Sequence, residues 1–269
     1  MSNNLRAGEF YGQVPNKRNI SSLTLTEVVH KQRVSVPKHS HELGHFQLLL
    51  GGSYLENCGG KDVSLQPMTV SWHRPGITHK DEIGNNGGRF FMIEMQSSSI
   101  DRLKEFADLP DDFYSRNSPL VWLGFRLYNE FKNWQFCSDL IAEGIVLEML
   151  AHSVRKQGFS EKQQPVWLLR IVEKLNEEFT ENLTTEELAI EAKVHPVHLA
   201  AVFRQFYQET MGEYVQKLRI AHASRLLLDK NLSLTEIAYS TGFSDQSHFN
   251  RIFKRYVGVT PGAFRNSID

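Results

Sequence analysis

The sequence predicts an α+β protein, with an N-terminal part of short strands and a C-terminal part made entirely of helices. Short alternating or apolar runs, separated by glycine and proline, occupy residues 23–95 and are typical of a small barrel or sandwich. From residue 98 onward the apolar residues recur at helical spacing. A helix, a glycine turn and a second helix at 233–255 have a similar copy about 50 residues earlier, which indicates a repeated supersecondary unit.

Composition sets the broad class of the protein. The chain has 269 residues, enough for two domains, and its 41% hydrophobic and 23% charged residues are ordinary for a globular protein. A net charge of −1 argues against a protein that coats polyanions in general, but not against one that reads a specific nucleic-acid sequence. Two cysteines, no secretory signal and no apolar run of membrane-spanning length favour a soluble, cytoplasmic protein.

Residues 1–97 are expected to form one β domain. Its first 20 or so residues are polar, and we expect them to be loose. We expect a hairpin turn at Gly51-Gly52, because paired glycines are frequent in tight turns. Strands are expected at 23–29, 46–50, 63–65, 69–72 and 90–95.

Residues 98–157 are expected to be helical, with a short helix at 99–107 that ends at Pro110 and longer ones at 119–131 and 139–154. The last helix has more apolar residues than one face needs: Leu140, Ile141, Ile145, Leu147, Met149 and Leu150. They can pack onto the barrel or pair with a second copy, and we favour a homodimer. Residues 158–165 are polar, with glycine and proline, and are expected to be a linker.

The stretch 233–255 predicts a helix-turn-helix. Ser233 and Glu236 have the spacing of a capping box, Gly242 suits the left-handed conformation that ends a helix, and Ser244 can cap the next one. The second helix has an apolar face of Phe249, Ile252 and Phe253. Its other face carries Gln246, Ser247, His248, Asn250, Arg251, Lys254 and Arg255. Amides and guanidinium groups on one face of such a helix are typical of a DNA reader. Thr260 and Pro261 then predict a further helix start.

The earlier copy has the same apolar spacing. Leu188-Ala189 corresponds to Ile237-Ala238, and Leu199 and Phe203 correspond to Phe249 and Phe253. Residues 212–228 lie between the copies without a proline, so we expect one long helix that fixes the spacing of the two units.

Residues from about 165 to 267 resemble the DNA-binding domain of the AraC/XylS family of bacterial transcription regulators. The resemblance rests on Leu188-Ala189 with Leu199 and Phe203, Arg219-Ile220 with Ala223 and Leu226-Leu227, Ile237-Ala238 with Gly242-Phe243, Phe249-Asn-Arg251 with Phe253-Lys254, and Gly258-Val-Thr-Pro261 with Arg265. It implies a domain at 166–269 with seven helices and two helix-turn-helix units, at 185–206 and 234–256, that enter successive major grooves of double-stranded DNA. It also implies a transcription regulator, more often an activator, with a contact to RNA polymerase.

Roles follow residue by residue. In the second unit Gln246, His248 and Arg251 are expected to read bases, and Ser247, Asn250, Lys254 and Arg255 to hold phosphates. In the first unit the expected DNA face is Val197, His198, Ala200, Ala201 and Arg204, on a helix that starts at Pro196. Ala201 departs from the arginine that the family often has there, and Lys193 replaces the usual turn glycine. The phosphate footprint is expected over Lys217, Arg219, Arg225, Lys230, Arg251, Lys254, Arg255 and Arg265.

Two N-terminal segments resemble the sequence motifs of the cupin barrel. The first is Val36-Pro-Lys-His39-Ser-His41-Glu42-Leu-Gly-His45 followed by Gly51-Gly52, and the second is Pro75-Gly76-Ile-Thr-His79 with altered spacing. A ligand-sensing cupin in front of the helix-turn-helix domain is the usual arrangement in the sugar-responsive AraC-type branch. The resemblance therefore implies an effector-binding barrel for a sugar or another small polar molecule.

The histidines admit two interpretations. His39 and His41 face the same way in a strand, and with His45 and His79 they offer nitrogen ligands for a divalent metal. The interpretation that we favour is an organic effector pocket lined by His39, His41, His45, Trp72 and His79, with no metal or other cofactor. The alternative is a metal-dependent cupin, either a metal sensor or an enzyme. The duplicated helix-turn-helix pattern argues against an enzyme.

Overall fold

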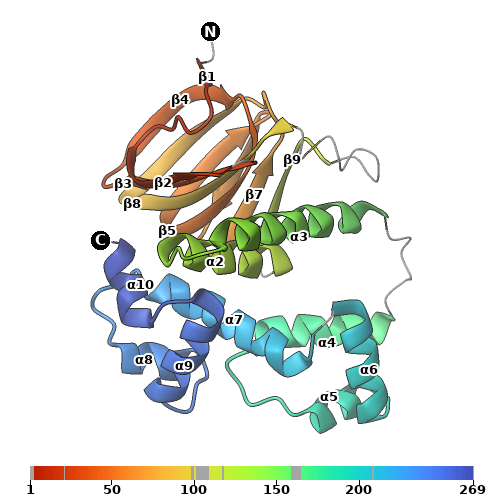
Figure 1. Ribbon diagram of the computed structural model, residues 1–269. Coiled ribbons are helices and arrows are strands. Elements are labelled where there is room, and N and C mark those ends of the chain that lie inside the picture. The colour runs from red at the N-terminus through yellow and green to blue at the C-terminus, as the bar shows by residue number, and fades with distance from the viewer. Residues whose placement is uncertain are drawn as a thin grey trace. The chain divides into compact units, whose positions relative to one another are not determined.

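The computed structural model describes residues 3–20, 22–97, 100, 109–116, 118–158, 165–207 and 209–268. These residues form a mixed α+β protein with a β-rich N-terminal part and a helical C-terminal part (Figure 1). The chain divides into two compact units. Unit 1 comprises residues 1–158 with 257–259 and 263–269, and unit 2 comprises residues 159–256 with 260–262. The helix expected at 99–107 and most of the expected linker lie outside the described residues.

Unit 1 contains a nine-stranded sheet in the order β1-β4-β8-β5-β7-β9, with β2 and β3 beside β8 and β6 beside β5. Within the described residues this path does not close on itself. The strand pairing therefore does not confirm the expected barrel. The strands are β1 (Asn3–Leu5), β2 (Gln13–Asn19), β3 (Leu23–His30), β4 (Val34–His41), β5 (Gly44–Cys58), β6 (Lys61–Leu65), β7 (Thr69–His73), β8 (His79–Met95) and β9 (Asp112–Arg116).

Strands β5 and β8 are long, and each belongs to two layers. The first half of β5 pairs with β7 and its second half pairs with β6. The first half of β8 pairs with β4 and its second half pairs with β3. A core cluster contains residues from both halves, so the layers face each other across it: Val28, Leu49, Tyr54, Leu65, Ile83, Phe90 and Met92.

The expected hairpin turn at Gly51-Gly52 is wrong. Strand β5 continues through both glycines, and its register with β8 shifts on either side of them. Gly52 has φ of +87°, and a Cβ atom there would lie 2.2 Å from the carbonyl oxygen of Gly87. The glycines therefore make a bulge where two backbones approach closely, and this bulge bends the strand between the layers.

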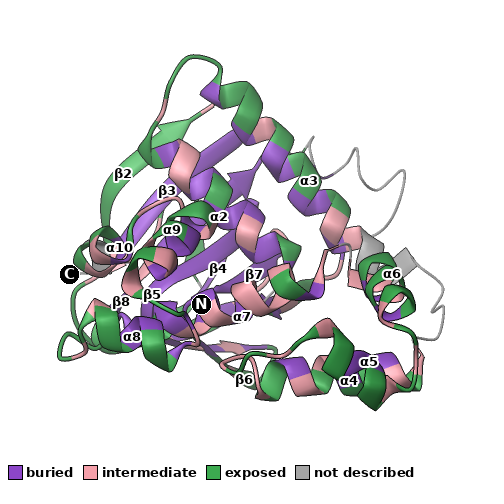
Figure 2. Ribbon diagram, turned by 90° about the horizontal axis from the view of Figure 1, so that it is seen from below, coloured by how far each residue is buried: buried purple, intermediate pink, exposed green. Residues whose placement is uncertain are grey.

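Two further expectations about unit 1 are corrected. The N-terminal segment contains β1 and β2, which pair with β4 and β3. Residues of β2 are exposed along its whole length (Figure 2), so it joins the sheet through backbone hydrogen bonds and leaves no apolar pattern in the sequence. Strand β9, which pairs with β7, interrupts the region that was expected to be helical throughout.

Helices α2 (Pro119–Lys132) and α3 (Ser138–Gly158) cover the sheet on the face away from the core cluster (Figure 1). Successive residues of β8 alternate between the two faces, so Phe90 and Met92 point to the cluster, whereas Phe91 lies 5.2 Å from the ring of Tyr128 on α2. The Tyr128 hydroxyl also donates to Glu27 of β3 at 2.8 Å. Burial on both faces explains why this layer gives continuous apolar runs.

The C-terminal part contains seven helices among the described residues. They are α4 (Val166–Glu177), α5 (Thr185–Ala192), α6 (Pro196–Tyr207), α7 (Met211–Leu226), α8 (Leu234–Ser240), α9 (Gln246–Val257) and α10 (Pro261–Ile268). Leu188, Leu199 and Phe203 are buried in the core that α4, α5 and α6 share, as their spacing predicted. The expected long helix between the two copies is α7.

Candidate functional site

The helix pair α8–α9 is fixed at its start and at its turn. Ser233 accepts a hydrogen bond from the amide of Glu236, and the Glu236 carboxylate accepts from the amide of Ser233 at 2.7 Å, which confirms the predicted capping box. Gly242 has φ of +82°, as predicted for a helix end. A Cβ atom there would lie 2.4 Å from the carbonyl oxygen of Thr180, so the turn requires glycine for space as well as for conformation.

Helix α9 is capped by Asp245 and not by Ser244. A carboxylate oxygen of Asp245 accepts from the amide of His248 at 2.7 Å, and this hydrogen bond lowers the pKa of Asp245. The Ser244 hydroxyl instead donates to Asp245. Neighbouring serine and aspartate are both good caps, so local sequence could not separate them.

One face of α9 is buried and the opposite face is exposed to solvent. Phe249, Ile252 and Phe253 are buried as predicted. Ser247, Arg251, Lys254 and Arg255 are exposed. Arg251 and Lys254 follow Ser247 by four and seven residues, so these three share one face of the helix.

The remaining predicted residues of α9 are half-buried. The Gln246 side chain accepts from the hydroxyl of Thr235 at 2.6 Å, and the ring of His248 lies edge-on to Phe243 at 5.5 Å. These two side chains, together with Asn250, therefore lie at the margin of the exposed face.

The pair α5–α6 has the same construction. Thr184 and Glu187 form a capping box, and α6 begins at Pro196 as predicted. Lys193 ends α5 with φ of 55° and ψ of 42°, the left-handed conformation that a residue other than glycine adopts at a steric cost. The face predicted to contact DNA is exposed: Val197, His198, Ala200, Ala201 and Arg204.

Two residues of the expected phosphate footprint make contacts within the protein. Lys217 pairs with Glu209 at 2.7 Å. Arg219 donates to the carbonyl oxygens of Phe179 at 2.7 Å and Glu181 at 2.8 Å, which ties α7 to the loop after α4. The Arg219 contacts join residues 40 and 38 positions apart in the sequence, so charge counting along the chain could not reveal them.

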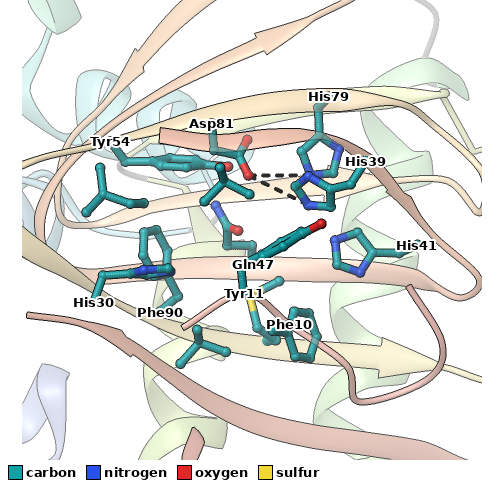
Figure 3. A pocket seen from close by; sticks show the side chains of 14 residues that line it. Phe10, Tyr11, His30, His39, His41, Gln47, Tyr54, His79, Asp81 and Phe90 are labelled. Carbon is teal, nitrogen blue, oxygen red and sulfur yellow. Dashed lines mark ion pairs between the residues drawn. The ribbon is translucent and has the colours of Figure 1, made fainter. Parts of the chain in front are cut away.

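A second candidate site is a cavity between the two layers of unit 1 (Figure 3). Three of the predicted histidines line it, His39 and His41 from β4 and His79 from β8. The remaining lining residues are Phe10, Tyr11, Val28, His30, Val36, Gln47, Tyr54, Asp81, Ile83, Phe90 and Met92. The cavity has a volume of about 40 Å³, room for a few water molecules.

The histidines of the two predicted motifs come together. The ring centroids of His39 and His79 are 4.3 Å apart, and those of His39 and His41 are 5.1 Å apart. Asp81 lies between two of them, with one carboxylate oxygen 3.7 Å from Nε2 of His39 and 3.8 Å from Nε2 of His79 (Figure 3). One nitrogen from each of His39, His41 and His79 lies within 4.8 Å of the others, close enough for a shared cation.

Two residues predicted to line the pocket do not. Trp72 is fully buried against Phe46, and its indole nitrogen donates to the carbonyl oxygen of Pro110 at 3.0 Å, so it belongs to the core on the other face of the layer. His45 is buried 4.5 Å from the ring of His41 but does not line the cavity. Adjacent residues of a strand point to opposite faces. Trp72 therefore points away from the histidine cluster, and its neighbour His73 points toward it, with its ring 5.0 Å from that of His79.

Sequence reasoning missed the acidic members of this cluster. Glu56 on β5 is fully buried and pairs with Nε2 of His73 on β7 at 2.8 Å. These residues belong to different layers, so the ion pair crosses the interior. Glu56 lies in no motif, and only the bend in β5 brings it to the histidines. Glu56 also lies outside every strand that the sequence predicted, so no pattern in the sequence indicated a buried acidic residue there.

Burial sets the protonation of the cluster. It lowers the pKa of His41 and His79, and neighbouring histidines lower it further. Burial and His73 lower the pKa of His45 to about 3. Burial and the charge of Glu56 raise the pKa of Asp81 to about 7. At neutral pH these three histidines are therefore uncharged, the form that accepts hydrogen bonds and binds metal ions.

In the part of the chain that the structure describes, no helix is both long enough and apolar enough to span a bilayer.

Comparison with known proteins gives matches to transcription regulators. A family of helix-turn-helix domains matches residues 188–267. The transcriptional regulator GlxA of Rhizobium meliloti is 39% identical over 98 residues, which are 36% of this chain and 30% of that protein. The chain therefore spans less than a third of the length of that relative.

Two other relatives match over more of their length. The "probable transcription factor PqrA" of Proteus vulgaris is 37% identical over 87 residues, 32% of this chain and 71% of that protein. A protein of Streptomyces lividans named as an AraC-like transcription regulator is 29% identical over 189 residues, 66% of this chain and 62% of that protein. This last match is too long to be confined to the helical C-terminal part.

Proposed function

This chain belongs to the AraC-type family of helix-turn-helix transcription regulators, and we propose that it reads double-stranded DNA with both α6 and α9. The observation that carries the proposal is the face of α9, where Ser247, Arg251 and Lys254 are exposed opposite a buried apolar face. Helix α6 has an exposed face at the corresponding positions. A recognition helix in the major groove needs this division between core and free surface.

The two helices differ in what they can read. On α9, Arg251 suits guanine and Gln246 suits adenine, with His248 as a third reader, whereas Ser247, Asn250, Lys254 and Arg255 hold phosphates. On α6, Val197, Ala200 and Ala201 offer methyl groups to thymine, and His198 and Arg204 supply the polar contacts. We expect stronger base discrimination at the α9 half of the binding site.

Selection of bound sequences from a pool of random DNA duplexes tests this proposal. The full chain should enrich one sequence whose two most constrained blocks are about one helical turn apart, roughly 10 base pairs. A chain with Arg251, Lys254 and Arg204 changed to alanine is the control and should enrich nothing. If the unmodified chain also enriches no sequence, the proposal is wrong.

We propose further that unit 1 is a cupin-like sensor whose cavity, about 40 Å³ in this structure, widens to bind a small effector. Hydroxyl, amide and imidazole groups of Tyr11, Gln47, Tyr54 and His41 supply polar contacts, and Phe10 and Phe90 supply apolar ones. Among the residues that the structure describes, no lysine or arginine lines the cavity, which favours an uncharged or cationic effector over an anionic one. Effector binding would shift a pre-existing equilibrium between DNA-binding states.

The same family membership supports a homodimer that activates transcription through a contact with RNA polymerase, in the cytoplasm. Helix α3 has an exposed stripe of apolar or small residues, Leu140, Gly144, Leu147 and Ala151, which recur at intervals of three and four. Leu140 is 68% exposed and Leu147 is 50% exposed. A stripe of this kind can pair with the same helix of a second copy.

A second candidate function is metal sensing. It is favoured by the convergence of three buried histidines from the two motif segments on one point. Neutral imidazoles are good ligands for divalent transition metals. In that case the cation would replace an organic effector as the signal.

A further inference from the structure

The cluster behind the cavity contains two buried carboxyl groups. Glu56 is fully buried and Asp81 is 7% exposed. Among the described residues, their ion pairs are with histidines alone: Glu56 with His73, and Asp81 with His39 and His79. A buried carboxylate is costly unless a cation or a proton compensates it. Burial would lower the pKa of His73, but the charge of Glu56 and their hydrogen bond raise it, and burial raises the pKa of Asp81 to about 7. Without a metal ion, only protons shared with these side chains compensate the two carboxylates, and a bound cation would displace them.

Three of these side chains already have the arrangement of a metal site. One ligand atom from each of Glu56, His73 and His79 lies within 4.8 Å of the other two, and all three residues are buried. They come from three strands, β5, β7 and β8, so the fold and not a flexible loop holds them together. A ring nitrogen of His73, Nδ1, is buried with no hydrogen-bond partner.

The donor set itself indicates the class of ion. Two imidazoles and one carboxylate are ligands of catalytic zinc sites and of mononuclear iron(II) sites, whereas calcium and magnesium prefer oxygen alone. Ligand atoms bound to one zinc ion at about 2.1 Å lie roughly 3.4 Å from each other in a tetrahedron. Nε2 of His73 and the Glu56 oxygen, which are 2.8 Å apart, would therefore separate slightly around the ion.

We propose that Glu56, His73 and His79 bind one divalent transition-metal ion, with Asp81 beside it as a second negative charge. This ion would neutralise the two carboxylates and join the two layers of unit 1 at their interior. Because His79 also lines the cavity, the ion would fix one wall of the effector site. The proposal deepens the sensor function proposed above and rests on it for its regulatory meaning.

The site differs from the one that the sequence motifs alone would give. The motif histidines form a separate group, His39, His41 and His79, which shares only His79 with it. Substitutions can therefore distinguish the two groups. Glu56→Gln and His73→Ala remove ligands of the proposed site, His41→Ala removes a ligand of the motif group, and His30→Ala changes the cavity wall without touching either.

The experiment is a titration of the full metal-free chain with Co²⁺, followed by visible absorption, with metal content measured after gel filtration. We expect one Co²⁺ per chain in the unmodified protein and in His30→Ala and His41→Ala. Glu56→Gln and His73→Ala should weaken binding at least a hundredfold. Circular dichroism of each metal-free variant shows whether it is folded, and a rise in Tm on adding Zn²⁺ gives a second measure of binding.

Two results would overturn the proposal. One is that no chain binds Co²⁺. The other is that His41→Ala loses the metal while Glu56→Gln keeps it, which would assign the ion to the motif group. DNA binding measured in EDTA separates this inference from the proposed function. A chain that selects DNA but binds no metal refutes the metal site alone, and a chain that binds metal but selects no DNA refutes the regulator.

Discussion

At the scale of single residues, Glu94 shows how burial makes stability depend on pH. Its side chain is fully buried and accepts from the amide of Gly8 at 2.8 Å. Burial raises its pKa to about 7, although the Gly8 hydrogen bond and Lys17 oppose the shift. The folded protein therefore holds this proton more tightly than the unfolded chain does. The resulting stabilisation is complete below pH 4.5 and is lost as the pH rises through 7.

Glu94→Gln should remove this dependence, because an amide keeps the shape of the protonated acid and does not ionise. We expect the Tm of the variant, relative to that of the unmodified chain, to increase as the pH rises from 5 to 8. Glu82→Gln is the matched control on the same strand, since its side chain is 45% exposed. A difference in Tm that stays constant over this pH range for Glu94→Gln would contradict the assignment.

Residues that act locally were predictable from sequence, and residues that act across the fold were not. The cap formed by Ser233 and Glu236 depends only on two residues three positions apart, so it could be predicted from the sequence. The pair of Glu56 and His73 depends on how two layers face each other, which no local pattern encodes. The same reason hid the contact between Arg219 and the loop after α4.

At the scale of elements, the two helix turns offer a direct comparison. Lys193 ends α5 in the left-handed conformation at a steric cost that glycine avoids. Lys193→Gly should therefore stabilise the protein by about 1 kcal/mol. Gly242→Ala should destabilise it by more than this amount, because the new Cβ would also collide with the Thr180 carbonyl oxygen. Urea unfolding measures both changes.

The control for this comparison is Lys193→Ala, which keeps a Cβ and should leave stability nearly unchanged. If Lys193→Ala stabilised the chain as much as glycine does, the gain would come from removing the lysine side chain and not from backbone strain. In that case the left-handed turn would not be a source of strain.

The helices of the C-terminal part were predictable because caps, glycine and apolar spacing all indicated the same boundaries. Strands were harder to predict from the sequence where only their backbone pairing, and not an apolar pattern, defines them. Strand β2 is exposed along its length and β9 has five residues, so neither leaves a period-two pattern strong enough to detect. The glycine pair in β5 indicated a change in direction, but its sequence could not distinguish a bulge from a turn.

At the scale of the whole molecule, the exposed stripe of α3 predicts a dimer. Leu147→Glu places a charge in that stripe and should convert the dimer to a monomer at micromolar concentration, because an unpaired charge cannot be buried in an apolar interface. Sedimentation equilibrium measures the mass. Leu169→Glu on α4 is the control, since Leu169 is 49% exposed and lies outside the stripe. A monomeric unmodified chain, or equal effects of both substitutions, would contradict this interface.

The division into a β-rich part and a helical part was predictable, as was the identity of the DNA-binding family, because its motifs extend over about a hundred residues. The closed barrel was not confirmed. Motif histidines indicated a common site, and His39, His41 and His79 do converge. The carboxylates that complete the cluster emerged only with the three-dimensional arrangement of the strands.

The decisive experiment on DNA reading by α9 compares the binding of Arg251→Ala and Lys254→Ala to the selected DNA sequence and to its single-base variants. Arg251→Ala should cost roughly 1–3 kcal/mol of binding and flatten the preference at one base pair, whereas Lys254→Ala should weaken all sequences alike and reduce the salt dependence. If Arg251→Ala leaves both affinity and base preference unchanged, α9 does not read DNA with the face assigned to it.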